Sequence, residues 1–413
     1  MTLSLRVAVI ALAAVASAGC QTYDFEPVVP LAVAQTTQAK TIVAKQQKPN
    51  MMILLDKSGS MAAPIDSTNP NCPAASCPGA SCPANCPTRI SELRSAMNTF
   101  LSANGNVARM GLTAYPTDPT CGASSSVRID VSSSNDVDTE LQATATQINQ
   151  AIQAIGITGS QPPGSTNEVG GGTPTGPSLN FLGTYTALQD PNRSDFILLL
   201  TDGLPNCNPS NSNNCLNAGA CKCTTSSCGT DTSAPFCTLG CLDQGGAVTA
   251  VNDLRTKDIR TIVVGFGADT GAGDGPLVLN AMAEAGGFAR GCPMGTNAEC
   301  GSNNTCDQAT KLCNKKFYQA SNGAELAAAL ADISNLIKNT NICEFRLEAA
   351  PTDERFISVI IDGTNLTRDD TSTWTYTAVG GEKVIILGKY CDDLRNSTTQ
   401  NPVKVEIRVV ETL

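Results

Sequence analysis

The chain has 413 residues, more than one average domain, so we expect one large domain and a smaller one. Its 37 acidic and 27 basic residues give a formal net charge of −10, which argues against binding to the phosphate backbone of a nucleic acid. The sequence contains no histidine, so serine–histidine and cysteine–histidine catalysis are excluded.

Residues 1–19 have the features of an export signal. Arg6 precedes an apolar stretch from Val7 to Val15, and small residues lead to Cys20. The segment is too short to be a stable membrane anchor. It resembles a bacterial lipoprotein signal, in which cleavage leaves Cys20 to be acylated. We therefore expect an exported, membrane-anchored lipoprotein on the bacterial outer membrane or cell surface. An ordinary cleavable signal is the alternative, because Ser17 departs from the lipoprotein pattern.

Residues 20–48 are rich in Pro, Gln, Thr and Ala and predict a tether. Part of this segment, around Thr41 to Ala44, could instead add a strand to the C-terminal region. The sequence does not decide between these two interpretations.

The stretch from Met51 to Met61 predicts a buried strand with polar residues at its end. The apolar run stops at Asp56, and two hydroxyls follow at Ser58 and Ser60. Residues just beyond the carboxyl end of a parallel strand enter the crevice where open α/β sheets bind ligands. Oxygen donors at this place suit a hard cation such as Mg²⁺.

Three cysteine-rich inserts are expected, at residues 62–88, 207–243 and 292–313. Nineteen cysteines less Cys20 leave eighteen, an even number that suits disulfides in an oxidising compartment. A zinc site around Cys221 and Cys223 is the alternative, but irregular spacing and the lack of histidine favour disulfides. The first insert with Cys121 and the second insert each hold an odd number of cysteines. At least one disulfide should therefore join these two groups if all pair and none reaches the third insert.

Alternating helices and strands follow the first insert. A glycine-rich loop, Gly170 to Gly172, brings Thr173 forward, and Pro177 suits the first turn of a helix that also carries Leu188. A phosphate loop is the competing interpretation, but no lysine follows the glycines and its signature is absent, so we expect no nucleotide. The other predicted elements are a helix from Ile90 to Leu101, strands at 108–115 and 126–131, helices at 137–155, 245–257, 276–285 and from Leu326 to Ile337, and strands at 259–267 and 317–318.

A second apolar strand, Phe196 to Leu200, ends in Thr201 and Asp202. Alternation of strands and helices implies an α/β fold with a doubly wound, mostly parallel, Rossmann-like sheet. With these motifs, residues 49–340 resemble the von Willebrand factor type A family. The metal-ion-dependent adhesion site of that family consists of an Asp-x-Ser-x-Ser motif after the first strand, a threonine from a glycine-rich loop and an aspartate at the end of the fourth strand. These parts correspond here to Asp56, Ser58 and Ser60, then Thr173, then Asp202.

The resemblance implies that these residues bind Mg²⁺, with Mn²⁺ or Ca²⁺ as alternatives. Three neutral hydroxyls would leave the cation electrophilic enough to take a carboxylate from a protein or glycan partner. Asp56 and Asp202 would act partly through water or through hydrogen bonds that orient the hydroxyls. The inserts near this site would either form the binding surface or cover it.

Residues 341–413 predict a small domain resembling a β-sandwich, with strands at 345–348, 356–361, 384–387 and 403–410. Cys343 and Cys391 are left as a disulfide pair. The whole sequence favours a non-enzymatic adhesion protein of the cell envelope. The alternatives are a structural envelope protein whose metal only makes the loops rigid, and a metal-assisted hydrolase with Asp56 or Asp202 as base.

Overall fold

The structure is a computed structural model. It describes residues 37–38, 48–66, 70–72, 85–134, 136–157, 167–190, 193–211, 221–225, 228, 239–340, 342–347, 349–378, 382–395, 403–409 and 411–412. The predicted signal segment and Cys20 lie outside the described residues. The chain divides into two compact units, one of residues 1–43, 348–366 and 404–413, and the other of residues 44–347 and 367–403.

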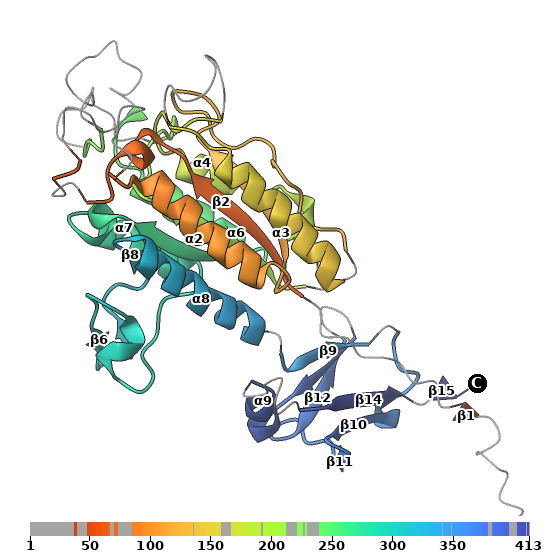
Figure 1. Ribbon diagram of the computed structural model, residues 1–413. Helices are drawn as coiled ribbons and strands as arrows, with labels where there is room; N and C mark the ends of the chain where they lie inside the picture. Colours follow the sequence, from red (N-terminus) through yellow and green to blue (C-terminus); the bar gives the residue numbers. More distant parts are fainter. Residues whose placement is uncertain are drawn as a thin grey trace, which may run out of the picture. The chain divides into compact units, whose positions relative to one another are not determined.

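A five-stranded parallel sheet forms the centre of the larger unit (Figure 1). Its strand order is β3-β2-β4-β5-β8, and every neighbouring pair is parallel. The predicted doubly wound α/β fold is therefore confirmed. The strands are β2 (Asn50–Asp56), β3 (Arg109–Tyr115), β4 (Asp195–Thr201), β5 (Ile259–Phe266) and β8 (Tyr318–Ala320).

Helices pack on both faces of this sheet, so successive residues of a central strand enter different cores. Met51, Ile53 and Leu55 belong to one buried cluster, whereas Met52 and Leu54 belong to the other. The first cluster includes residues of α2 (Arg89–Asn104), α3 (Asp138–Gln153) and α8 (Gly323–Thr340). The second includes residues of α4 (Thr175–Leu182), α6 (Gln244–Arg255) and α7 (Gly275–Ala285).

Two predicted elements were wrong. Residues 126–131 form only an isolated bridge, because the backbone N–H groups of Arg128 and Ile129 both donate to the Leu112 carbonyl and interrupt the ladder. The helix that begins at Thr175 ends at Leu182, where Gly183 follows as its C-cap. Leu188 is buried, but it lies in a separate 3₁₀ turn, Thr186–Leu188.

Disulfides join the cysteines in the described part of the chain. One of them, Cys121–Cys207, links the first cysteine group to the second, as the odd cysteine counts predict. Cysteines of the alternative zinc site are paired as Cys221–Cys241 and Cys223–Cys228. The other bridges are Cys72–Cys86, Cys292–Cys306, Cys300–Cys313 and Cys343–Cys391.

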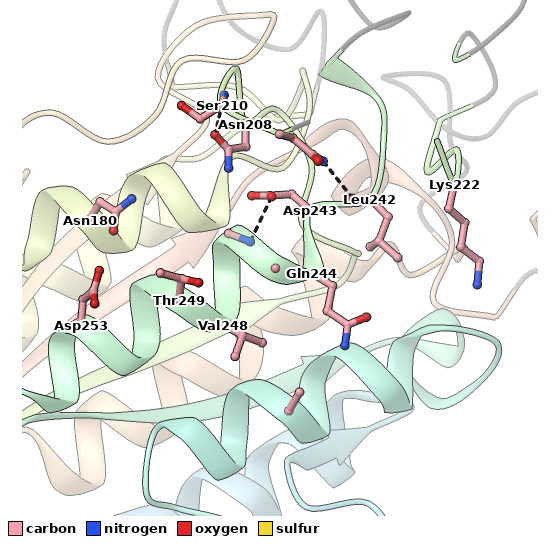
Figure 2. A pocket seen from close by; sticks show the side chains of 14 residues that line it. Asn180, Asn208, Ser210, Lys222, Leu242, Asp243, Gln244, Val248, Thr249 and Asp253 are labelled. Atoms are coloured by element: carbon pink, nitrogen blue, oxygen red, sulfur yellow. Dashed lines mark hydrogen bonds between the residues drawn. The ribbon is translucent and has the colours of Figure 1, made fainter. Parts of the chain in front are cut away.

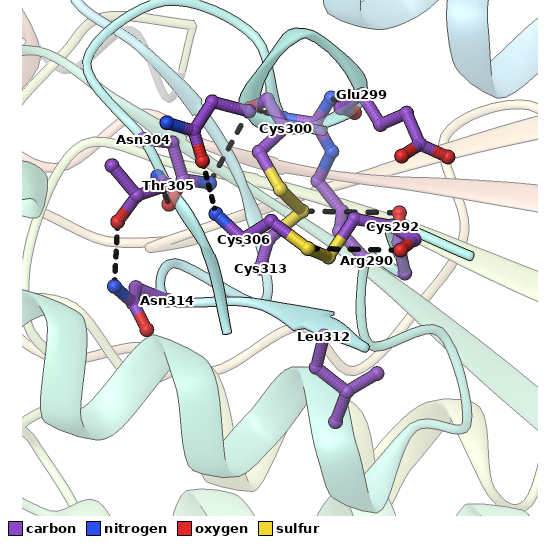
Figure 3. Close-up of a disulfide and its surroundings, with 12 residues drawn as sticks. Arg290, Cys292, Glu299, Cys300, Asn304, Thr305, Cys306, Leu312, Cys313 and Asn314 are labelled. Atoms are coloured by element: carbon purple, nitrogen blue, oxygen red, sulfur yellow. Dashed lines mark hydrogen bonds between the residues drawn. A yellow bond between two sulfur atoms is a disulfide. The ribbon is translucent and has the colours of Figure 1, made fainter. Parts of the chain in front are cut away.

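The third insert is a small knob held by two crossed disulfides (Figure 3). Its four cysteines are buried against one another and form a cluster of their own. A short hairpin, β6 (Cys306–Asp307) and β7 (Leu312–Cys313), carries two of them. Disulfides thus supply the interior that so few apolar residues could not.

Short antiparallel strands make up the C-terminal region. In the larger unit β9 (Glu344–Arg346), β12 (Trp374–Thr377) and β13 (Lys383–Ile386) form one sheet, followed by α9 (Gly388–Arg395). In the smaller unit β10 (Ile357–Ile361), β11 (Thr364–Leu366) and β14 (Val405–Val409) form another. The boundaries of a separate domain at 341–413 stay a prediction.

The predicted tether contains one described strand, β1 (Thr37–Gln38). This strand pairs with β15 (Glu411–Thr412) near the C-terminus. The tether therefore adds a strand to the C-terminal region, although Thr41 to Ala44 lie outside the described residues. Within the described residues, no helix has both the length and the apolar character that crossing a membrane requires.

A buried carboxylate at the start of β4 predicts a pH-dependent stability. Asp195 is 4% exposed and accepts a hydrogen bond from the Asn50 amide, 2.8 Å. Burial, the largest cause, raises the pKa of Asp195 from 3.8 to about 7. The folded chain therefore holds this proton more tightly than the unfolded chain, and ionisation costs stability as the pH rises from about 4 to 7.

We expect Asp195→Asn to raise the free energy of unfolding at pH 8 by about 1 to 3 kcal/mol. The advantage should vanish near pH 3, below the unfolded-state pKa of 3.8, where wild-type Asp195 is mostly protonated in both states. Urea unfolding at the two pH values measures the difference. Asp253→Asn, at an exposed position, is the matched control and should leave the free energy of unfolding at pH 8 within about 0.5 kcal/mol of wild type. An advantage of equal size at both pH values would contradict the prediction.

Candidate metal site

The five predicted ligands come together at the carboxyl edge of the sheet. Asp56 is the last residue of β2, and Ser58 and Ser60 follow it. Asp202 comes directly after β4, the parallel neighbour of β2. Thr173 lies two residues before α4. All except the half-buried Ser60 are at most 5% exposed.

A chain of hydrogen bonds connects four of these residues. The hydroxyl oxygens of Ser58 and Ser60 lie 3.0 Å apart, and the Ser60 hydroxyl donates to Asp202 Oδ1 at 2.9 Å. Asp56 Oδ1 accepts from the backbone N–H of Ser58 at 2.8 Å. Asp56 Oδ2 accepts from the hydroxyl of Thr201 at 2.7 Å. Both carboxylates are thus fixed in orientation by the same cluster.

Thr173, the fifth predicted ligand, faces this cluster across Gly203. A Cβ atom at Gly203 would lie 3.5 Å from Ser60 Oγ and 3.7 Å from Thr173 Oγ1. The two hydroxyls therefore border a common space that glycine leaves open. This space and the surrounding carboxylate and hydroxyl oxygens fit a hard divalent cation.

Glycines allow the Thr173 loop to approach the Asp56 turn closely. The backbone N–H of Gly170 donates to the Lys57 carbonyl at 2.9 Å, and Gly59 donates to the Gly171 carbonyl at 3.0 Å. Gly171 has φ +75°, and a Cβ there would lie 2.5 Å from the Thr120 carbonyl oxygen. Only glycine fits at this position without displacement of the Thr120 turn.

Asn206 holds the Thr173 backbone from the other side, and the sequence did not predict it. The Asn206 side-chain Oδ1 accepts from the Thr173 backbone N–H at 2.7 Å, and the Asn206 backbone N–H donates to the Thr173 carbonyl at 2.9 Å. The next residue, Cys207, forms the disulfide with Cys121. The one signal in the sequence is that a polar side chain directly precedes a cysteine, four residues after Asp202.

Arg89 is a second residue that could not be predicted from the sequence. It is the first residue of α2, and its Nη1 donates to Asp202 Oδ2 at 2.9 Å. The Arg89 side chain is 9% exposed and that of Asp202 is fully buried, so the pair is an internal ion pair. The only sequence signal is an arginine directly after the Thr88 N-cap.

The site carries an excess of negative charge when its groups are ionised. Asp56 and Asp202 contribute two carboxylates, and Arg89 compensates one. Burial and then the nearby Asp202 carboxylate raise the pKa of Asp56 to about 7. A divalent cation would offset both effects, because it restores the favourable interactions that burial removes.

The basic residue within the motif does not oppose the cation directly. Lys57 lies between Asp56 and Ser58, and its Nζ donates to the Glu168 carbonyl at 3.1 Å. Burial, the largest cause, lowers the pKa of Lys57 to about 8. Lys57 therefore supports the loop that precedes Thr173.

A polar pocket of about 920 Å³ lies near the N-terminus of α6 (Figure 2). It is lined by residues of the second insert and of α4, α6 and α7, such as Asn180, Asn208 and Gln244. Asp243 caps α6 by accepting from the Gly246 N–H at 3.2 Å. None of the five predicted metal ligands lines this pocket.

No protein-family profile and no curated protein matches the sequence. Similar solved structures include the PilB minor pilin of Streptococcus sanguinis, with 17% identity and a TM-score of 0.40, where 71% of this chain covers 62% of the pilin. The pilus adhesin SpaC of Lactobacillus rhamnosus GG has 14% identity and a TM-score of 0.41, with 91% of this chain covering 42% of SpaC. A von Willebrand factor type A protein of Catenulispora acidiphila has 11% identity and a TM-score of 0.32, over 91% and 66% of the two chains.

Proposed function

We propose that this chain binds a divalent cation through Asp56, Ser58, Ser60, Thr173 and Asp202, and that the ion binds an acidic group of a protein or glycan partner. The observation that carries the proposal is that the Ser60 and Thr173 hydroxyls border the space that Gly203 leaves open. Ser60 is hydrogen-bonded to Ser58 and to Asp202, and Asp56 accepts from the Ser58 N–H, so all five residues belong to one cluster. We take Mg²⁺ as the first candidate, because it prefers oxygen ligands, with Mn²⁺ or Ca²⁺ as alternatives.

The ion would supply positive charge that attracts a carboxylate from outside. The chain's own residues orient the site: Ser58 N–H and Thr201 hold Asp56, Ser60 holds Asp202, and Asn206 holds the Thr173 backbone. This fixed arrangement lowers the entropy lost on binding. A binding role is favoured over a hydrolytic one, because the oxygens of Asp56 and Asp202 already accept internal hydrogen bonds and the chain has no histidine to act as base.

The proposed setting is the bacterial cell surface. The signal-like segment and the acylatable Cys20 suggest an exported lipoprotein on the outer membrane, where the many disulfides would persist. The role would be adhesion or another protein–protein interaction. Neither a nucleic acid nor a nucleotide is part of this proposal.

A structural role in the envelope is the second candidate. It is favoured by the disulfide Cys121–Cys207, which fastens the loops around the site whether or not an ion is present. In that case the metal would only make these loops more rigid. Binding of a carboxylate to the loaded ion separates the two candidates.

Titration of the chelator-stripped, fully oxidised chain with Mg²⁺ and Mn²⁺ tests the metal site. We expect one-to-one binding, and a loss of about tenfold in affinity for Thr173→Ala, because one oxygen donor is removed. Isothermal titration calorimetry measures both. Thr249→Ala on the exposed side of α6 is the matched control and should bind as wild type. A folded wild-type chain that binds neither ion would overturn the proposal.

The carboxylate-binding step needs its own readout. With Mn²⁺ bound, millimolar acetate should lower the water-proton relaxation enhancement, because the carboxylate displaces a water from the ion. Acetamide has the same shape without the charge and should have no effect. If acetate and acetamide act alike while Mn²⁺ stays bound, the structural candidate is favoured.

A further inference from the structure

A buried arginine beside a metal ligand is the feature that the proposed function leaves unexplained. A cation at this place repels the ion that the site is proposed to bind. Asp202 Oδ1 accepts from Ser60, whereas Oδ2 accepts from Arg89, so both of its oxygens are already engaged. Arg89 Nη1 also lies 3.4 Å from the Asp202 backbone carbonyl.

Three segments of the fold hold Arg89 in this position. Thr88 caps α2 through a reciprocal capping box with Ser91, which fixes the start of the helix. The Arg89 backbone N–H donates to the Ala63 carbonyl at 2.9 Å, at the edge of the first insert. Gly267 follows β5 with φ +93°, and a Cβ there would lie 3.1 Å from Arg89 Nε. The arginine is therefore a built part of the sheet edge.

The guanidinium has two opposite effects on the site. It stabilises the metal-free protein, because an unpaired carboxylate at Asp202 would be buried without compensation. It weakens cation binding, because it adds one positive charge next to a ligand. With Arg89, the two carboxylates and a divalent ion leave a net positive site. Without Arg89 the loaded site would be neutral and would attract an outside carboxylate less.

We propose that Arg89 is a positioning residue that orients Asp202 toward Ser60 and lowers the cation affinity of the site, so that the bound ion keeps its attraction for an external carboxylate. The inference rests on the proposed function, since it concerns the same site. According to this inference, Arg89 makes the loaded site bind an acidic partner more tightly than a neutral one. Arg89 itself is 7% exposed, so it acts on the partner through Asp202 and the ion.

The test compares Arg89→Gln, Arg89→Lys and Arg94→Gln with wild type. Arg94 lies in the same helix and donates to the Ile155 carbonyl, so it is the matched control. Arg89→Gln should bind Mn²⁺ about tenfold more tightly and unfold at a lower temperature without metal. Arg89→Lys keeps the charge and should stay within about threefold of wild type. Acetate should bind about tenfold more weakly to Mn²⁺-loaded Arg89→Gln.

A higher Mn²⁺ affinity together with a lower unfolding temperature of the metal-free protein identifies this role. A merely structural residue would lower both stability and metal affinity when it is replaced. If Arg89→Gln folds and binds Mn²⁺ no more tightly than wild type, the inference is overturned while the metal site stands. If wild type and Arg94→Gln bind no ion, the proposed function and the inference both fail. If Arg89→Gln does not fold, the double variant Arg89→Gln/Asp202→Asn replaces it, because it leaves no buried carboxylate unpaired at position 202. The double variant should bind Mn²⁺ about tenfold more tightly than Asp202→Asn alone.

Discussion

Asp56→Asn is expected to weaken Mn²⁺ binding at least about 100-fold and to leave the metal-free protein no less stable. One unit charge at 4 Å from another is worth about 4 kcal/mol at an effective dielectric constant of about 20, and the ion is divalent. Dehydration offsets part of this, and a tenfold change in affinity corresponds to about 1.4 kcal/mol. The metal-free variant should be no less stable than metal-free wild type, because the substitution removes one of two buried carboxylates that repel each other.

Calorimetric titration and thermal unfolding of the chelator-stripped protein measure the two quantities. Asparagine keeps an oxygen that can accept from the Ser58 N–H, so the turn should persist. Asp253→Asn changes the net charge equally at an exposed position and should leave the Mn²⁺ affinity unchanged. If Asp56→Asn binds Mn²⁺ as tightly as wild type, the ion binds at another site.

The centre of the sheet could be predicted because β2 and β4 contain continuous apolar runs. A strand buried on both faces has no polar positions, as in Phe196 to Leu200, and such runs between helices imply parallel pairing. The candidate site followed from the same property, because the first polar residue after a buried strand lies at the carboxyl edge. Asp56 and Asp202 could therefore each be placed at this edge, and the resemblance to the von Willebrand factor type A family grouped them into one site. The structure shows that their strands are parallel neighbours.

The residues that support the site could not be predicted in this way. Arg89 reaches Asp202 over 113 positions in the sequence, and Asn206 reaches Thr173 over 33. Such contacts depend on where a helix starts or a loop returns, which apolar periodicity does not encode. The interrupted pairing around Ile129 has the same origin, since one extra residue in the ladder leaves no mark on the pattern.

Cysteine counting was informative where spacing was not. An odd number in each of two segments predicts a bridge between them, but it does not say which residues pair. The structure assigns the bridge to Cys121 and Cys207. Cys121 follows Thr120, whose carbonyl accepts from the Gly172 N–H, and Cys207 follows Asn206, which holds Thr173. The bridge thus joins the two segments that contact the glycine-rich loop on either side.

Removal of this bridge in the Cys121→Ser/Cys207→Ser variant should lower both stability and metal affinity. The bridge closes a loop of 86 residues, for which the chain-entropy estimate is about 4 to 5 kcal/mol, and observed losses are more often about 2 to 4 kcal/mol. Mn²⁺ affinity should fall about tenfold, because Thr173 loses the fixed backbone that orients its hydroxyl. Urea unfolding and calorimetric titration of the oxidised proteins measure the two effects.

The matched control is Cys300→Ser/Cys313→Ser in the knob of residues 292–313. This second variant also loses one disulfide, and it should lose stability without a change in Mn²⁺ affinity, because its residues belong to a separate buried cluster. Equal loss of affinity in both variants would mean that the metal site only follows global stability. Loss confined to Cys121→Ser/Cys207→Ser would mean that the bridge holds the Thr173 loop in the geometry that binds the ion.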